Sequence, residues 1–225
     1  MTKTIIITGS GKGIGKETSI QAAKSGINVI AISRNTESLK NIKNIVPLNI
    51  DITKKESLNE LVNLLKTKKI RIDGLINNAG CLIKKPFLNT DIEIFKKVYE
   101  VNVFGLAEIT RLVIPFIHNY GHVVNISSMG GIQGSLKFSG LSAYSSSKGA
   151  VSILTEMLAE EYKETGPSFN CLAIGAVQTE MLENAFPGYK AKVSAKKFAS
   201  YLLDFLLNGS KFYNGKVLQV SLSTP

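Results

Sequence analysis

The sequence is poor in the residue types that hold disulfide-rich or metal-dependent folds together. Only two cysteines, Cys81 and Cys171, and two histidines occur among the 225 residues. Two cysteines do not provide a disulfide framework, and no His, Cys and Asp residues stand at the spacing of a metal site. We therefore predict a protein without a bound metal. Free cysteines indicate a reducing compartment, and we expect a cytoplasmic location.

Long apolar runs are also missing. No segment approaches the roughly 18 consecutive apolar residues that a membrane span needs. The opening stretch, MTKTIIITGSGKG, reaches its glycines too early to contain the apolar region of a signal peptide, so we expect neither a leader nor a membrane partner. Hydrophobic residues make up 44% of the chain and charged residues 20%, values typical of a globular protein. A single domain, residues 1–225, fits this length.

Acidic residues are few compared with basic ones, and the formal net charge is +10. Solvated lysines on helix faces, an acidic partner or anionic cofactor, and nucleic acid are the possible explanations. The lysines are scattered, with no long basic run and no basic motif interleaved with aromatics, and this disfavours nucleic acid.

Short apolar runs alternate with amphipathic stretches along the chain. Several runs are apolar throughout, as in parallel strands that are covered on both faces. The pattern predicts an α/β fold: a single-domain, Rossmann-type doubly wound parallel sheet with helices on both faces. Predicted strands are 4–8, 28–33, 45–50, 74–77, 122–126, 168–174 and 216–220, and predicted helices are 14–25, 57–66, 91–119 (broken or bent near Pro115), 144–165 and 194–207.

A glycine-rich segment, TGSGKGIGKET, follows the first predicted strand and opens the first predicted helix. Glycines there allow positive φ and let the backbone approach a pyrophosphate at a helix N-terminus. A P-loop is the alternative, because Gly15 precedes Lys16. It fails because Ser10 stands where the first P-loop glycine belongs and Glu17 replaces the Ser or Thr that would hold magnesium. We predict a dinucleotide site; its glycines are Gly9, Gly11, Gly13 and Gly15.

The end of the second predicted strand indicates which dinucleotide binds. NAD enzymes usually place Asp or Glu there, to hold the ribose 2′-hydroxyl. Here Ser33 and Arg34 occupy the place. The guanidinium of Arg34 suits a 2′-phosphate, and Lys12 adds a second positive charge, so NADP(H) is the predicted cofactor.

Five motifs follow one another in a specific order over roughly the whole chain. They are TGSGKGIG, NNAG at 77–80, VNVFG around Asn102, VVNISS ending at Ser128, and YSSSK at 144–148. Together they resemble the short-chain dehydrogenase/reductase family, and most of all its Tyr-dependent carbonyl reductases, which include the 3-oxoacyl-acyl carrier protein reductases.

The resemblance implies a catalytic group. Tyr144 and Lys148 stand at i and i+4 and share one helix face. A neighbouring ammonium and a positive nicotinamide favour the phenolate and are expected to lower the pKa of Tyr144. Tyr144 would exchange the proton, Lys148 would hold the nicotinamide ribose, Ser128 would hydrogen-bond the substrate carbonyl, and Asn102 would bind a water linking Lys148 to solvent. Ser127 competes with Ser128, and the family pattern favours the second serine.

Further cofactor contacts follow from the resemblance. Asp51 and Ile52 resemble the adenine-binding pair, and Ile174 replaces a proline of the family, which is expected to loosen the loop after it. The C-terminal VLQVSLSTP lacks the usual Gly-Gly; a homodimer through 91–119 and 144–165 is expected, with a tetramer possible. The implied cofactor contacts are Gly9, Ser10, Gly11, Lys12, Gly13, Ile14, Gly15, Ser33, Arg34, Asp51, Ile52, Asn78, Ala79, Gly80, Tyr144, Lys148, Gly175, Val177 and Thr179.

The substrate is less defined by the sequence. We expect the segment between Ser128 and Tyr144 to form one pocket wall, and the short segment after Thr179 to leave an open site. The substrate is then a small-molecule or carrier-tethered carbonyl, such as a 3-oxoacyl thioester; sugars, polyols and other small ketones are the alternative. A dinucleotide sensor without turnover is disfavoured, because Tyr144 and Lys148 are both present. An apolar entrance or ordinary packing accounts equally well for Met181, Leu182, Phe186 and Tyr189.

Overall fold

The computed structural model describes residues 2–222, and its centre is one parallel sheet. The strands lie in the order β3-β2-β1-β4-β5-β6-β7, and every neighbouring pair runs parallel. This confirms the predicted fold class. The strands are β1 Thr4–Thr8, β2 Asn28–Ser33, β3 Ile45–Asn49, β4 Ile72–Asn77, β5 Ile117–Ser128, β6 Ser168–Ile174 and β7 Lys216–Val220.

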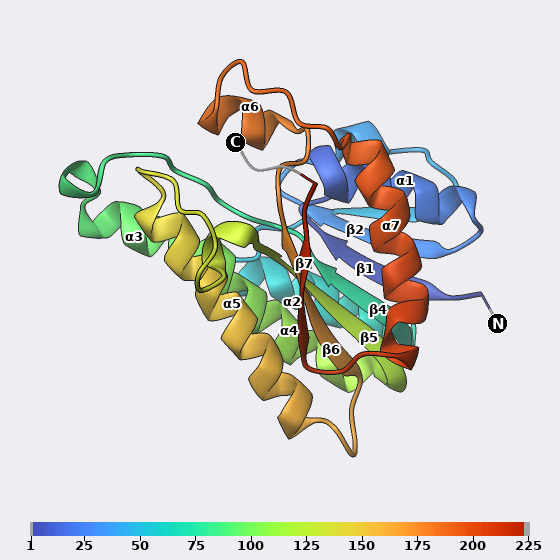
Figure 1. The fold of residues 1–225 in the computed structure, drawn as a ribbon. Helices are drawn as coiled ribbons and strands as arrows, with labels where there is room; N and C mark the ends of the chain where they lie inside the picture. The colour runs from blue at the N-terminus through green and yellow to red at the C-terminus, as the bar shows by residue number, and fades with distance from the viewer. Residues whose placement is uncertain (1, 223–225) are drawn as a thin grey trace.

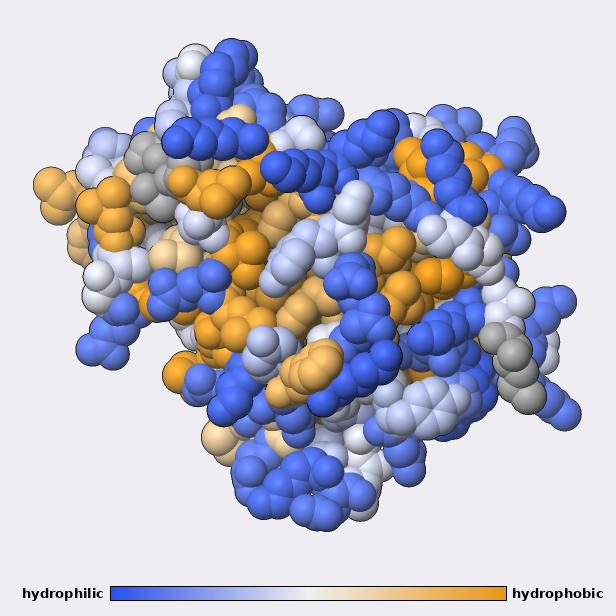
Figure 2. Space-filling view, turned by 45° about the vertical axis from the view of Figure 1, so that its right-hand side comes forward, coloured by the Kyte–Doolittle hydropathy of each residue, from blue (hydrophilic) through white to orange (hydrophobic). Residues whose placement is uncertain are grey.

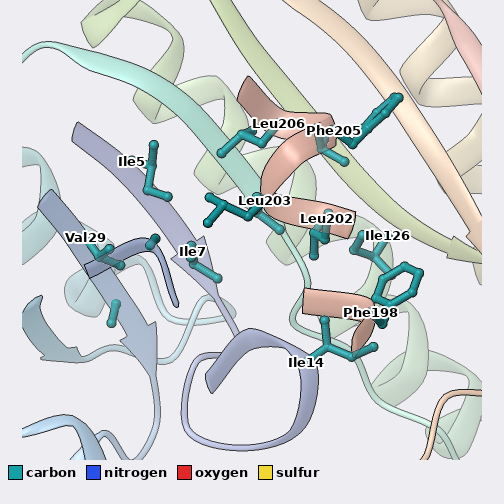
Figure 3. Close-up of a cluster of buried hydrophobic side chains, with 14 of the residues drawn as sticks. Ile5, Ile7, Ile14, Val29, Ile126, Phe198, Leu202, Leu203, Phe205 and Leu206 are labelled. Carbon is teal, nitrogen blue, oxygen red and sulfur yellow. The ribbon is translucent and has the colours of Figure 1, made fainter. Parts of the chain in front are cut away.

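The apolar run of β1 explains how the sheet is buried on both faces. Ile5 and Ile7 point into one hydrophobic cluster, whereas Ile6 between them points into another. Side chains alternate along a strand, so an uninterrupted run of isoleucines supplies both layers. Figure 3 shows the first cluster, in which Ile5 and Ile7 meet helix residues such as Leu203.

Helices cover both faces of the sheet. α1 and α7 pack on one face, and α2, α4 and α5 lie on the other (Figure 1). Burying these two layers supplies the main driving force for folding. The helices are α1 Gly13–Lys24, α2 Lys55–Thr67, α3 Ile92–Tyr99, α4 Leu106–Val113, α5 Ser142–Glu161, α6 Glu180–Ala185 and α7 Ala195–Asn208.

The predicted helix 91–119 was wrong in two respects. It contains a π-helical turn, Glu100–Gly105, between α3 and α4, and residues 117–119 belong to β5. Pro115 lies in a 3₁₀ turn that ends the helix, because proline cannot donate a backbone hydrogen bond. Arg71 then donates to the carbonyls of Pro115 and Ile117, at 3.0 Å each, and fixes the chain as it enters the sheet.

One predicted boundary needs correction, and one helix was not predicted. α5 ends at Glu161 rather than at Thr165, because the amides of Thr165 and Gly166 both bond to the carbonyl of Tyr162 in a turn. The short helix α6 was not predicted. Thr179 caps it by accepting a hydrogen bond from the backbone of Leu182 at 3.2 Å.

The surface mixes lysines with apolar side chains. Figure 2 shows apolar patches between hydrophilic residues on the face that it draws. Large exposed apolar side chains occur on α5, where Ile153 is 61% and Met157 59% exposed. Among residues 2–222, no helix is long and apolar enough to cross a membrane. The end of the C-terminal motif, residues 223–225, lies outside the described residues.

Candidate active site

A cleft of about 700 Å³ opens at the carboxyl ends of the strands. The chain leaves β1 for β2 and β3 on one side and returns to β4 on the other, and ligands of such sheets bind where the order reverses. Residues that the sequence places far apart meet here. The predicted residues lining the cleft are Gly9, Lys12, Gly13, Ile14, Ser33, Arg34, Asp51, Ile52, Asn78, Ala79, Gly80, Ser128, Tyr144, Lys148, Gly175, Val177 and Thr179.

The start of α1 faces this cleft with unused backbone donors. Lys12, the residue before the helix, makes no side-chain cap, and the first turn holds no acidic residue. Gly13 has φ +56°, a conformation that glycine adopts without strain. The first amide groups of a helix have no partner within the helix, so this end is suited to an anion such as a pyrophosphate.

Three predicted contact residues of the glycine segment do not line the cleft. The Ser10 hydroxyl is buried, where it donates to the Ile7 carbonyl at 2.8 Å and accepts from Ser19. A Cβ on Gly15 would lie 2.4 Å from the carbonyl oxygen of Gly9, and one on Gly11 would come equally close to Asn35. The packing of the loop therefore explains why a serine stands at position 10 and glycines at positions 11 and 15.

Arg34 lies exposed at the far end of the cleft, after β2. Within the part of the chain that the structure describes, its guanidinium has no hydrogen bond or ion pair, so its planar fork is available. Lys12 differs, because it pairs with Glu180 at 3.0 Å. The second positive charge expected from Lys12 is thus balanced by a carboxylate that the sequence analysis did not consider.

Asp51 is oriented by a residue that the sequence analysis missed. Thr53 donates to one Asp51 oxygen from its backbone at 3.0 Å and from its hydroxyl at 2.8 Å, and it also lines the cleft. Burial would raise the pKa of Asp51, but these bonds and the charges of Arg34 and Lys54 outweigh it and hold the pKa below its usual value. The Asp-x-Thr spacing is a signal that would have identified Thr53.

Asn78 joins the ends of β1 and β4 beneath the cleft. Its amide nitrogen donates to the carbonyl of Thr8 at 3.0 Å, and its backbone donates to the Thr8 hydroxyl at the same distance. Ala79 donates to that hydroxyl as well. Thr8, also missed in the sequence, therefore fixes the segment that begins the cleft wall.

Ser128, Tyr144 and Lys148 meet on one wall of the cleft. Lys148 is only 4% exposed, and its ammonium donates to the carbonyl of Ile126 at 2.8 Å. Ser128 ends β5, its hydroxyl accepts from the backbone of Gly130 at 3.2 Å, and it lies close enough to Tyr144 to affect the pKa of that residue. One helix and one strand end thus hold the three side chains together.

Burial controls the ionisation of this group in the chain itself. It raises the pKa of Tyr144 to about 12, against a smaller lowering by the hydrogen bond with Ser128. It also lowers the pKa of Lys148 to about 8. In the chain alone, desolvation therefore outweighs the lowering of the Tyr144 pKa that the sequence argument expected, and the pKa is raised instead. The contribution of a positive nicotinamide stays a prediction.

The two adjacent serines at the end of β5 have different environments. Ser127 is buried and donates to the carbonyl of Lys148 at 2.7 Å, while Ser152 donates to its hydroxyl. Its hydrogen bonds tie β5 to α5. Ser128 remains half-buried beside Tyr144, as the choice of the second serine requires.

Asn102 lies in the π-helical turn but does not line the cleft. Its oxygen accepts from the backbone of Cys81 at 2.7 Å, and its nitrogen donates to the Cys81 carbonyl and to Ser147. These bonds use both amide protons of the side chain and fix Cys81 against α5. The water that the resemblance implies between Lys148 and solvent, held by Asn102, stays a prediction.

Apolar residues from separate segments surround the catalytic end of the cleft. Between β5 and α5, Met129, Phe138 and Leu141 line it, as expected for that segment. Met181, Leu182 and Phe186 line it from the other side, which decides for the apolar entrance over simple packing; Tyr189 is not part of the lining.

The loop after β6 is tied to the sheet on both sides. Ile174, which replaces the family's proline, pairs with Ser128 and with Val220, and the Gly175 amide donates to the Val220 carbonyl at 2.9 Å. The expected loosening of this loop stays a prediction.

Comparison with known proteins agrees with this geometry. A family model described as short chain dehydrogenase matches residues 3–190. The chain belongs to the short chain dehydrogenase family. It is an oxidoreductase of that family, which interconverts CH–OH and C=O groups.

Individual relatives share moderate identity. The 3-oxoacyl-[acyl-carrier-protein] reductase of Thermotoga maritima is 31% identical over 191 residues, covering 80% of this chain and 76% of that protein. A solved structure of ElxO with NADPH bound is 28% identical, with a TM-score of 0.84 and 98% of each chain covered. A 4-hydroxyisoleucine dehydrogenase complexed with NADH has a TM-score of 0.86 at 24% identity, covering 98% of this chain and 97% of that one, and is similar in fold.

Proposed function

We propose that the protein reduces an apolar ketone or 3-oxoacyl compound to its alcohol with NADPH. The observation that carries the proposal is the meeting of Ser128, Tyr144 and Lys148 on one wall of a cleft whose far end holds Arg34 and no carboxylate at the end of β2. The free α1 N-terminus between them fits a pyrophosphate.

The cofactor would lie along this cleft. Bound NADPH supplies the hydride. Lys12, Gly13 and Ile14 would hold the pyrophosphate, and Arg34 would hold the 2′-phosphate with charge-assisted hydrogen bonds. The adenine side would rest against Ile52 and Asp51. At the other end, Gly175, Val177 and Thr179 would receive the carboxamide.

The chain's own residues would position and protonate the substrate. Ser128 donates a hydrogen bond to the substrate carbonyl oxygen and holds it at Tyr144. Tyr144 is protonated at neutral pH, because burial raises its pKa to about 12, and it donates the phenolic proton to that oxygen. Lys148 then stabilises the phenolate through its charge and holds the ribose.

The substrate end of the cleft favours apolar carbonyl compounds. Its lining includes Met129, Phe138, Met181 and Phe186, which offer few partners for the hydroxyl groups of a sugar or polyol. A hydroxyl-rich substrate would lose hydrogen bonds to water without replacement. Sugars and polyols therefore rank second, and 3-oxoacyl thioesters, carrier-tethered or free, rank first.

The experiment that tests this proposal follows NADPH absorbance with a panel of acyl thioesters, diketones, quinones, aldehydes and sugars, with NADH run in parallel. Faster oxidation of NADPH than of NADH, with apolar oxo compounds, is the expected result. The Tyr144→Phe variant is the control for background reduction. Turnover confined to sugars would contradict the proposed substrate class. Equal use of NADPH and NADH would contradict the proposed cofactor preference.

A further inference from the structure

A second, smaller cavity of about 440 Å³ lies beside the active-site cleft. Its lining combines two lysines, Lys84 and Lys85, with the rings of Phe138 and Phe186 and the segment 139–140. Phe138 and Phe186 also line the main cleft. Their ring centres are 5.6 Å apart in an edge-to-face arrangement, so this pair of aromatic rings borders both spaces.

Lys84 is held in place rather than left to move in solvent. Its ammonium donates to the carbonyl of Ala185 at 3.1 Å and lies 4.1 Å from the centre of the Phe186 ring. An ammonium has three donors, and only one is used in this way, so two remain for another acceptor. The contact also joins the segment after β4 to the C-terminal end of α6.

Lys85 is fixed through its backbone. Its amide donates to the carbonyl of Gly140 at 2.8 Å, which joins the same segment to the one between β5 and α5. Gly140 has φ +82°, and a Cβ there would come within 3.2 Å of the Lys84 side chain. Three separate segments therefore converge to build a cavity with two positive charges, and no acidic side chain is part of its described lining.

We propose that this outer cavity binds the anionic end of the substrate. The carbonyl would lie at Tyr144, an apolar chain would pass Phe138 and Phe186, and a carboxylate or phosphate would meet Lys84 and Lys85. The substrate class is thus an apolar oxo compound with a terminal anion. This inference rests on the proposed function of the main cleft.

The backbone gives a length scale for such a substrate. A Cβ on Gly80 would lie 3.7 Å from the Lys148 ammonium, so Gly80 marks the catalytic end. Lys84 follows four residues later, and an extended chain covers at most about 14 Å in that interval. Because the lysine side chains add their own reach to this span, the oxo acids compared should include lengths on both sides of it.

The first test compares oxo acids of increasing length with their neutral methyl esters. The measured quantity is the ratio of kcat/KM for each acid to kcat/KM for its ester. We expect the acid to be favoured at one chain length, and Lys84→Met or Lys85→Met each to reduce the ratio about five-fold. About 1 M salt should reduce the preference in the same way. If the acid-to-ester ratio of kcat/KM is unchanged in the variant that carries both Lys84→Met and Lys85→Met, the proposal is overturned.

Controls separate charge from loop structure. Lys66→Met removes an exposed lysine of α2 that lines neither cavity, and the acid-to-ester ratio should not change. Lys84→Arg keeps the charge and should preserve the preference. If Lys84→Arg behaves as Lys84→Met does, and Lys85→Met has no effect, Lys84 only fastens the loops and the proposal fails.

A binding measurement distinguishes this site from the proposed activity. Calorimetry with alkyl carboxylates that have no ketone, and with the matching alkyl phosphates and methyl esters, needs no turnover. We expect the carboxylates or the phosphates to bind, and this binding to be lost in the variant that carries both Lys84→Met and Lys85→Met. That result would support the outer site even if no ketone were reduced. The series that binds more tightly would show which anion the site prefers. Reduction of ketones with equal binding of acids and esters would support the activity and reject the site.

Discussion

The ammonium of Lys148 lies 5.8 Å from the ring centre of Tyr144, one helical turn further along α5, and bonds to the Ile126 carbonyl at 2.8 Å. The lysine is therefore fixed by the strand β5 and not by the tyrosine. Since Ser128 ends the same strand, this bond sets α5 against the residue that would hold the carbonyl. The helix α5 therefore supplies Tyr144 and Lys148, and the strand β5 positions Ser128 beside them.

Tyr144→Phe tests the proton donor. The change removes one hydroxyl and keeps the ring, so kcat should fall by roughly 10²- to 10⁴-fold while the Kd for NADPH stays within about two-fold. Steady-state rates and fluorescence titration measure the two effects. Ser146→Ala, on an exposed position of the same helix, is the matched control and should leave both unchanged. An equal loss of binding and turnover would indicate a structural tyrosine.

Arg34→Ala tests the choice between the two cofactors. Loss of hydrogen bonds between a guanidinium and a phosphate should weaken NADPH by about 10- to 100-fold and leave NADH nearly unaffected. Titrations with both cofactors measure this. Lys40→Ala, at an exposed lysine paired with Glu37, is the control for a general loss of positive charge. Arg34 does not bind the 2′-phosphate if the two cofactors weaken alike.

The pKa of Lys148 predicts a pH dependence. Burial lowers this pKa to about 8, so the ammonium is lost as the pH rises through 8. If the charge is needed to hold the cofactor, kcat/KM for NADPH, which reports on the free enzyme, should fall about ten-fold per pH unit above that value. Tyr144 titrates near 12 and does not account for such a break. Lys148→Arg stays charged, so any remaining activity should show no break near pH 8.

His122 predicts a loss of stability in acid. It is buried, with Nδ1 at 3.0 Å from the Leu206 carbonyl and Nε2 at 2.9 Å from the Asn170 amide, contacts that suit the neutral ring. Burial lowers its pKa from 6.5 to about 4, so the unfolded chain binds the extra proton first. Stability is complete above about pH 6.5, and about 3 kcal/mol should be lost as the pH falls to 4.

Urea unfolding at several pH values measures this loss. His122→Gln should reduce the slope of stability between pH 6.5 and 4, whatever its effect at neutral pH, because no group then titrates at this position. His118→Asn should keep the slope. The depressed pKa of Asp51 contributes as well, but at lower pH, since a carboxylate gives its stability above the unfolded pKa near 4. A slope that survives in His122→Gln would contradict the assignment.

A dimer through α5 is the remaining prediction. Ile153 and Met157 stand one turn apart on this helix and are both more than half exposed. Placing a charge on an apolar contact is costly, so Ile153→Asp with Met157→Asp should shift the protein to a monomer in light scattering. Lys24→Asp, at an exposed position of α1 on the opposite face of the sheet, is the control and should keep the wild-type mass. A wild type that is already monomeric would reject the interface.

Local patterns in the sequence determined the fold and the position of the active-site cleft. The isoleucine run of β1, the glycine loop and the spacing of Tyr144 and Lys148 predict the sheet, the cleft and the catalytic helix, because strand alternation, positive φ and i, i+4 geometry depend only on near neighbours. The order of the motifs along the chain is sufficient to assign it to the short chain dehydrogenase family.

Tertiary structure decided what depends on distant partners. Desolvation determines the pKa values of Tyr144 and Lys148, and it arises from everything packed around them. Asn102 is occupied by Cys81, and Lys12 is balanced by Glu180, which lies far along the chain. The outer cavity likewise exists only because three loops meet. The local sequence of each loop does not indicate that the other two lie next to it.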